Sequence, residues 1–126
     1  MSGIRRISSG GLFEGKVGYC RAVVADGWIH VAGTTAQGTE IPDDVVGQCQ
    51  SALGTIKAAL EEAGASMEDV VRVTYILPNP DDFAPCWPLL AETFGANPPA
   101  GTMISTGLID PRYKIEIEVT AWRQGV

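Results

Sequence analysis

Histidine, cysteine and basic residues are scarce in this chain of 126 residues. His30 is the only histidine, so most metal sites and Ser-His-Asp chemistry would depend on it alone. The three cysteines, Cys20, Cys49 and Cys86, are odd in number and have no CxxC spacing, which argues against a disulfide framework or a zinc site. Nine basic residues against fifteen acidic ones give a net charge of −6, which disfavours a nucleic-acid partner.

Long apolar runs are also missing. None approaches the ~20 residues that a membrane helix needs, and the N-terminal segment 1–6 has no apolar stretch after its basic residues, as a secretory signal would. We therefore expect a cytoplasmic protein with no membrane partner. The length predicts one domain, residues 1–126, because two would each be too small to bury a good core.

A hairpin and a long helix give the clearest local patterns. Two β-rich runs, 19–25 and 28–34, are separated by Asp26-Gly27, which predicts a hairpin with a type I′ turn. Apolar residues then recur at spacings of three and four over 45–63, which predicts a helix. Asp43-Asp44 can cap its start, and Gly64 is the expected residue after its end.

The remaining pattern predicts an α+β fold of order β-β-α-β-α-β-β. Strands are expected at 70–77, 102–105 and 115–121, and a second helix at 84–94. The βαβ connections place both helices on one face of a mixed sheet. One layer of helices cannot cover both faces, so we infer an oligomer. On the first helix, Gln48 is expected to face solvent with the other polar residues.

Several isolated side chains could carry chemistry. Glu116 and Glu118 point the same way from one strand, about 6.6–7 Å apart by strand rise. They could act as acid and base. The simpler interpretation is a solvated or interface strand face, because the alternation of polar and apolar residues along a strand also puts two glutamates on one side. His30 could be a general base or a simple sheet-face histidine. Cys86, near a helix start, is the better thiol nucleophile candidate, and a buried inert thiol is the simpler interpretation.

Three isolated arginines could each bind a carboxylate: Arg21, Arg72 and Arg112. An ordinary ion pair or surface position is the simpler interpretation for each of them.

Short motifs in an ordered series run along nearly the whole chain. They are Gly18-Tyr19, Ala32-Gly33-Thr34, Gln48 with Ala63-Gly64-Ala65, Asp69-Val70-Val71-Arg72-Val73-Thr74, Asp81-Asp82-Phe83-Ala84, Asn97-Pro98-Pro99-Ala100 and Ile115-Glu116-Ile117-Glu118. Any one of them is weak, but the ordered series resembles the Rid family (reactive-intermediate deaminases, RidA- or YjgF-like).

The resemblance implies a chorismate-mutase-like fold and a homotrimer. The three sheets would form a central barrel with the helices outside and with pockets in the clefts between subunits. Known members hydrolyse imines and enamines derived from amino acids and release ammonia, with no metal or cofactor. In them an arginine holds the substrate carboxylate, and a glutamate positions or activates the water.

Three positions match the pocket that the resemblance implies: Tyr19, Gly33 and Glu116. Glu116 would be the catalytic residue that positions or activates the water. Gly33 would let the backbone approach the ligand.

Three other positions depart from the family's pattern. Gly101 stands where the carboxylate-binding arginine is expected, Trp87 replaces a polar asparagine, and Met103 replaces a small residue or cysteine. Losing the arginine removes a contact of about 1.5–3 kcal/mol, so we expect poor activity on the usual 2-imino acids. Trp87 and Met103 make the substrate-binding pocket more apolar and could stack on a planar ligand, or Trp87 could simply fill the pocket.

Two classes of function follow, with a third that is disfavoured. The first is a cofactor-independent hydrolase or deaminase that acts on an imine, enamine or related planar small molecule. The second is a ligand-binding or regulatory trimer that has lost the chemistry. Arg21 or Arg112 reaching into the cleft would favour the first, and a cleft plugged by Trp87 the second. An endoribonuclease or translation inhibitor is disfavoured by the acidic charge.

Overall fold

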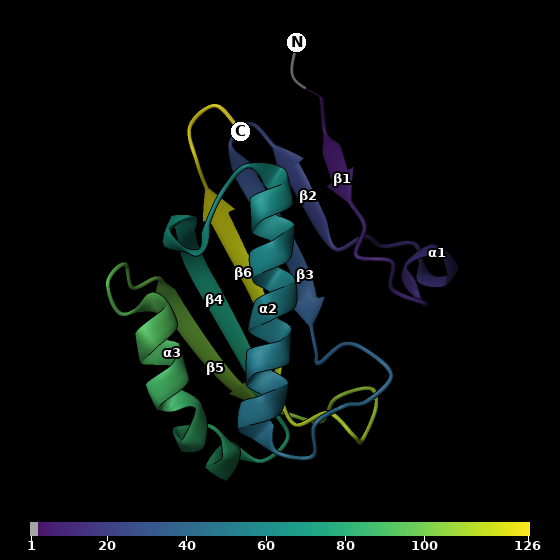
Figure 1. Cartoon of the computed structure of the whole chain (residues 1–126), viewed down its shortest axis with the longest axis vertical. Helices are drawn as coiled ribbons and strands as arrows, with labels where there is room; N and C mark the ends of the chain where they lie inside the picture. The colour runs from purple at the N-terminus through teal and green to yellow at the C-terminus, as the bar shows by residue number, and fades with distance from the viewer. Residues whose placement is uncertain (1–2) are drawn as a thin grey trace.

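The computed structural model describes residues 3–126 and contains a six-stranded mixed sheet (Figure 1). The strands are β1 (Arg5–Ile7), β2 (Ala22–Ala25), β3 (Trp28–Thr34), β4 (Val70–Leu77), β5 (Ala100–Ser105) and β6 (Glu116–Trp122). Their order across the sheet is β1-β2-β3-β6-β4-β5, and the β4–β5 pair is parallel while the others are antiparallel. Met1 and Ser2, which begin the N-terminal segment considered above, lie outside the described residues.

The two longer helices lie on one face of this sheet, as the sequence predicts, and a short third helix lies beside it (Figure 1). They are α1 (Glu14–Val17), α2 (Val45–Ala63) and α3 (Trp87–Phe94), with 3-10 turns at Met67–Asp69, Pro80–Asp82 and Ala84–Cys86. The long helices α2 and α3 cross the same face, and the short α1 lies beside the sheet beyond β1 (Figure 1). The α+β prediction is confirmed. No helix within residues 3–126 is long and apolar enough to span a membrane.

The β2–β3 hairpin has the predicted turn. Asp26 and Gly27 have φ angles of 51° and 86°, which is the left-handed pair that a type I′ turn requires. A Cβ atom on Gly27 would lie 2.8 Å from Nε1 of Trp122, so glycine is needed here for space as well.

Helix α2 begins and ends at the predicted residues. The Asp44 side chain accepts a hydrogen bond from the N–H of Gly47 at 2.8 Å, and Gly64 ends the helix with φ 93°. The apolar face of α2 packs on the sheet, where Ile56 and Leu60 are fully buried.

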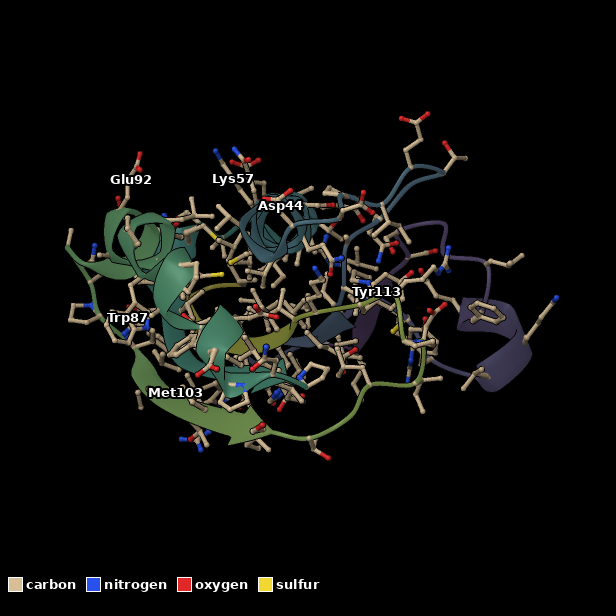
Figure 2. The ribbon with its side chains drawn as sticks, turned by 90° about the horizontal axis from the view of Figure 1, so that it is seen from below. Asp44, Lys57, Trp87, Glu92, Met103 and Tyr113 are labelled. Carbon is tan, nitrogen blue, oxygen red and sulfur yellow. The ribbon has the colours of Figure 1, made fainter. Side chains whose placement is uncertain are left out.

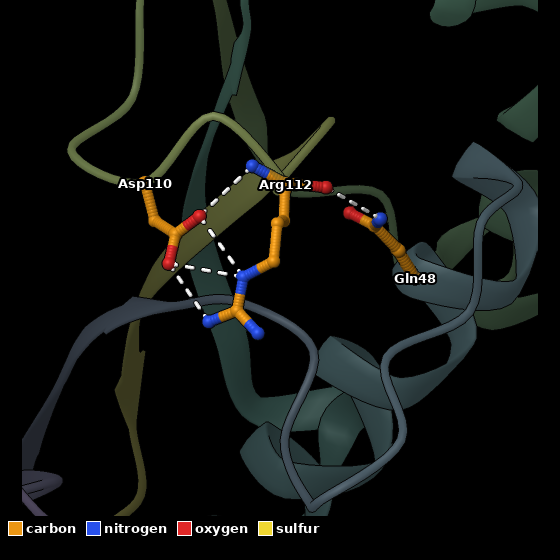
Figure 3. A network of polar contacts seen from close by, with 3 residues as sticks. All are labelled: Gln48, Asp110 and Arg112. Atoms are coloured by element: carbon orange, nitrogen blue, oxygen red, sulfur yellow. Dashed lines mark hydrogen bonds and ion pairs between the residues drawn. The ribbon is translucent and has the colours of Figure 1, made fainter.

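Gln48 corrects one expectation about this helix. It is buried rather than solvent-facing, because its amide joins α2 to two loops. Its Nε2 donates to the carbonyl oxygens of Pro42 (2.8 Å) and Arg112 (3.0 Å), and its Oε1 accepts from the N–H of Lys114 (2.7 Å). Figure 3 shows the contact with Arg112. Gln48 follows Val45 by three residues and precedes Ala52 by four, so the helical period places it on the buried face. The expectation failed because it followed the polar residue type, which does not reveal a buried hydrogen-bond partner.

Some boundaries differ from the prediction. Strand β1 and helix α1 were not predicted, and α3 begins at Trp87 rather than at residue 84. The prolines at 85 and 88 occupy a 3-10 turn and the first α-helical turn, where an absent N–H costs little. Strand β5 begins two residues earlier than expected, at Ala100, and β6 begins and ends one residue later.

The sheet face opposite the helices carries exposed side chains. The apolar positions of β6 face the helices and are buried, whereas Glu118 and Trp122 point the other way and are exposed. Trp28 pairs with Trp122 across the strands, and both indole side chains are about two-fifths exposed. His30 is exposed on the same face, in agreement with a sheet-face histidine.

Candidate functional site

A cavity of about 950 Å³ lies where β3 ends and β6 begins. Its walls come from three loops, before β2, after β3 and before β6. Three of the six predicted site residues, Tyr19, Gly33 and Glu116, line it together. The lining also includes residues 10–13, 35–39 and 108–113, and Arg21.

The carboxylate of Glu116 occupies the space beside Gly33 where a larger residue would place its side chain. A Cβ atom built on Gly33 would lie 3.0 Å from both Cδ and Oε2 of Glu116. The strand pairing is irregular between Val31 and Thr34, which brings this part of β3 against the start of β6. The resemblance to the Rid family implies that Gly33 lets the backbone approach a ligand. In this structure the group that lies close to the Gly33 backbone is the Glu116 carboxylate.

The environment of Glu116 favours its protonated form. Burial raises the pKa of this half-buried carboxyl above its usual 4.5, and the negative charge of Glu118 raises it further, while Arg21 opposes the shift. A carboxylate with a raised pKa is a stronger base at neutral pH than an exposed one. This is the property that a group activating water requires.

Arg21 is buried beside the same carboxylate, which corrects the simpler interpretation of an ion-paired or surface arginine. Its Nη1 donates to the carbonyl of Gly33 (2.9 Å) and to Oγ1 of Thr34 (3.0 Å), and its Nε donates to Oγ of Ser9 (3.2 Å). The guanidinium carbon lies 5.7 Å from the centre of the Tyr19 ring. Among residues 3–126, no carboxylate oxygen lies within 4.0 Å of the guanidinium nitrogens.

Arg112 and Arg72 behave as the simpler interpretation expects. Arg112 is exposed, and its Nε donates to both carboxylate oxygens of Asp110 at 3.1 Å while its Nη2 donates to Oδ2 at 2.8 Å (Figure 3). Arg72 is exposed on β4 and donates to Oγ1 of Thr102 at 3.0 Å. Arg112 lines the cavity that contains Glu116, and Arg72 does not.

The other three predicted site residues lie on a different part of the chain. Trp87 opens α3, and Gly101 and Met103 lie on the edge strand β5. Figure 2 shows Trp87 and Met103 on the left of the molecule and the cavity residue Tyr113 to the right of its centre. Trp87 and Met103 are each more than half exposed, so one chain does not bring the six residues together. At Gly101, a Cβ atom would meet only Val73, at an ordinary 3.8 Å.

The cysteines offer no activated thiol. Cys49 and Cys86 are both buried, and burial raises the pKa of Cys49 to about 12 and also raises that of Cys86. Cys20 is half-buried, with its Sγ 3.4 Å from the carbonyl oxygen of Ala22. The inert interpretation of Cys86 agrees with this environment. In the described part of the chain, no group of three or more His, Cys, Asp and Glu side chains could hold a metal ion.

The loop before α1 is a part of the site that the sequence did not point to. Buried Glu14 holds it, since its Oε2 accepts from the N–H of Ser9 (3.2 Å), from Oγ of Ser9 (2.8 Å) and from the N–H of Gly11 (2.9 Å). Leu12 and Phe13 of this loop line the cavity and remain largely exposed. The Gly10-Gly11 pair signals a turn, but no local pattern places that turn on Glu116.

Comparison with known proteins gives one consistent family. The family description "Endoribonuclease L-PSP" matches residues 13–123. A RutC family protein of Pyrococcus abyssi is 34% identical over 84% of this chain and 87% of its own. The crystal structure of Rv2704 from Mycobacterium tuberculosis, a member of the YjgF/YER057c/UK114 family, is 36% identical with a TM-score of 0.89 over 96% of this chain and 100% of its own.

A more distant likeness concerns the fold alone. The Rid family protein YyfA from Yersinia pestis is 20% identical, with a TM-score of 0.85 over 96% of this chain and 100% of its own. The motif series, the fold and the close relatives agree. The chain therefore belongs to the Rid family, the YjgF/YER057c/UK114 proteins that carry the endoribonuclease L-PSP domain.

Proposed function

We propose that the protein is a cofactor-independent hydrolase that acts on an imine, an enamine or a related planar small molecule. The observation that carries this proposal is the half-buried Glu116 carboxylate, which has a raised pKa and lies against Gly33 in a cavity of about 950 Å³. Tyr19 and Arg21 line the same cavity, so a ligand beside Glu116 meets an aromatic ring and a cation.

The proposed reaction is the hydrolysis of a carbon–nitrogen double bond. Water attacks the imine carbon while the Glu116 carboxylate accepts its proton. Glu116 passes this proton to nitrogen, which gives a carbinolamine. Glu116 then takes the hydroxyl proton and delivers it to the same nitrogen, so that the carbonyl bond forms, the carbon–nitrogen bond breaks and ammonia leaves. One water is consumed, and the carboxylate ends in its starting form.

A second copy of the chain completes the cavity in this proposal. Trp87, Gly101 and Met103 lie on an exposed edge formed by α3 and β5, and none of them lines the Glu116 cavity of the same chain. In a homotrimer the β5–α3 edge of one copy would close the Glu116 cavity of its neighbour. The exposed Trp87, Met103 and Ile104 side chains on this edge suit such a contact.

The substrate should differ from the small 2-imino acids. Gly101 presents no cation from the β5 edge, and the cavity is far larger than a three- or four-carbon acid requires. Exposed Leu12, Phe13 and Ile109 on its lining favour a substrate with a bulky apolar group.

The contents of the cavity support an enzyme over a ligand-binding protein without chemistry. Arg21 and Arg112 both line it, and Trp87 does not fill it within one chain. A regulatory trimer without chemistry would not need a carboxylate such as Glu116 with a raised pKa, nor a glycine such as Gly33 that leaves room for that carboxylate.

The test is ammonia release from imines generated in situ by an amino-acid oxidase. We expect the wild-type protein to accelerate hydrolysis of the imine made from phenylalanine at least about tenfold over that of 2-iminopropanoate. Glu116→Ala should lose about 10²–10⁴-fold, and Gly101→Arg, which the space at residue 101 permits, should raise activity on 2-iminopropanoate. Binding without acceleration of any imine would favour the ligand-binding trimer. Rapid wild-type turnover of 2-iminopropanoate would contradict the role given to Gly101.

A further inference from the structure

We propose that Arg21 holds the anionic end of the ligand, from the wall of the cavity formed by β2 and β3, and that the ligand is a carboxylate with a bulky apolar group. This inference rests on the proposed cavity, but it concerns binding and does not require turnover. It assigns to a different residue the charge that Gly101 cannot supply.

The guanidinium of Arg21 has only neutral direct partners in the described structure. Its hydrogen bonds go to two hydroxyl groups and one carbonyl, of Ser9, Thr34 and Gly33. Glu14 reaches it only through the Ser9 hydroxyl, and Glu116 lies beyond ion-pair distance. A buried cation without a carboxylate partner is costly, and a ligand carboxylate would supply that partner.

The donor capacity of Arg21 is not fully used by its hydrogen bonds within the described residues. Nε and Nη1 make the hydrogen bonds given above, and none of these involves Nη2. Arg21 lines the cavity while its residue is only 3% exposed. An anion there would meet a guanidinium already fixed in place, so little side-chain entropy would be lost on binding.

Arg112 is the other cation on the cavity wall, and it is already neutralised. Asp110 accepts from its Nε and Nη2, and the pair is exposed to solvent. A ligand carboxylate would have to compete with Asp110 and with water there. The same competition is absent at Arg21.

The cavity also suits the rest of such a ligand. Gly33 touches Arg21 through its carbonyl oxygen and lies against the carboxylate of Glu116, so the two charged groups flank one backbone position. A carboxylate on Arg21 therefore places the neighbouring ligand atoms close to Glu116. The apolar end would cover Leu12, Phe13 and Ile109, which are otherwise exposed.

The test compares the binding of cinnamate and cinnamamide by calorimetry at pH 7.5. The two probes have nearly the same shape, and only cinnamate carries a charge. We expect the wild-type protein to bind cinnamate at least about tenfold more tightly than cinnamamide, and more tightly than propanoate. Arg21→Gln should remove the preference for charge, Arg21→Lys should keep part of it, and Arg112→Gln should keep it. Thermal melting checks that each variant is folded.

Three results would overturn the inference. They are equal wild-type binding of the two probes, no binding of either probe, and loss of the preference in Arg112→Gln but not in Arg21→Gln. Should Arg21→Gln be unfolded, the wild-type comparison and Arg21→Lys still decide. A preference that depends on Arg21 without imine turnover would refute the hydrolase and leave this assignment standing. Imine turnover that Arg21→Gln does not alter would refute the assignment of Arg21 and leave the hydrolase standing.

Discussion

Gly33 is the residue at which one added carbon should matter most. In Gly33→Ala the new methyl group would lie 3.0 Å from the Glu116 carboxylate, so that side chain must move while the backbone remains. Because small displacements of a catalytic group cost about 10²-fold in rate, we expect imine hydrolysis to fall at least about tenfold with little change in Tm. Steady-state kinetics and thermal melting measure the two effects.

Gly54→Ala is the matched control for that substitution. A Cβ atom at Gly54 meets nothing within 4 Å, and the residue lies on α2. Its activity should equal that of the wild type. Equal activity of both alanine variants would show that the contact between Gly33 and Glu116 has no role in the reaction.

Glu118 sets the pH dependence of Glu116 in this account. A base acts as the carboxylate, so the rate should rise with pH through the pKa of Glu116, which lies above 4.5. Glu118→Gln removes a negative charge that raises this pKa. The acidic limb of the rate profile should therefore move to lower pH, and Arg21→Gln should move it the other way. A limb that neither variant moves would exclude Glu116 as the group that titrates.

Single residues could be predicted from the sequence only where a motif carried them. The family motifs pointed to Tyr19, Gly33 and Glu116, and the structure places these three on one cavity. Arg21 was classed with surface arginines because its burial depends on Ser9, a loop residue that no periodicity brings near it. The sequence around an isolated arginine does not show which distant residues contact its side chain.

At the scale of the elements, Gln48 joins α2 to the loop that forms one cavity wall. Gln48→Ala would leave the carbonyls of Pro42 and Arg112 and the N–H of Lys114 without this partner. We expect a loss of about 3 kcal/mol in the free energy of unfolding, measured by urea denaturation. Gln50→Ala, at an exposed position of the same helix, should change it by less than about 0.5 kcal/mol. Similar losses of unfolding free energy in both variants would show that the hydrogen bonds of Gln48 between α2 and the loops do not stabilise the fold.

Elements with strong local signals were predictable, and those that depend on distant partners were not. The β2–β3 hairpin, α2 and β4 follow from turn residues, caps and periodicity, and β4 matches the predicted 70–77. Strand β1 has three residues and only Ile7 of them is buried, so its pairing with β2 leaves little trace in the sequence. The short α1 has no side-chain cap and owes its position to Glu14.

For the whole molecule, the uncovered sheet face predicts self-association. Trp28, Trp122 and Ile104 are exposed on or beside that face, and only three of the six predicted site residues line the Glu116 cavity of one chain. We expect a homotrimer of three times the chain mass of 13.3 kDa in light scattering at micromolar concentration. A stable monomer would contradict both the trimer and the closing of the cavity by a neighbouring β5–α3 edge.

The role of Glu116 in imine hydrolysis is tested by the rate at which ammonia is released from the imine of phenylalanine, compared between wild type and Glu116→Gln. The substitution keeps the shape of the side chain but removes its negative charge and its ability to accept a proton. We expect acceleration by the wild type and a return to nearly the uncatalysed rate in the variant, with the trimer and Tm retained. Equal acceleration by both proteins would contradict this role.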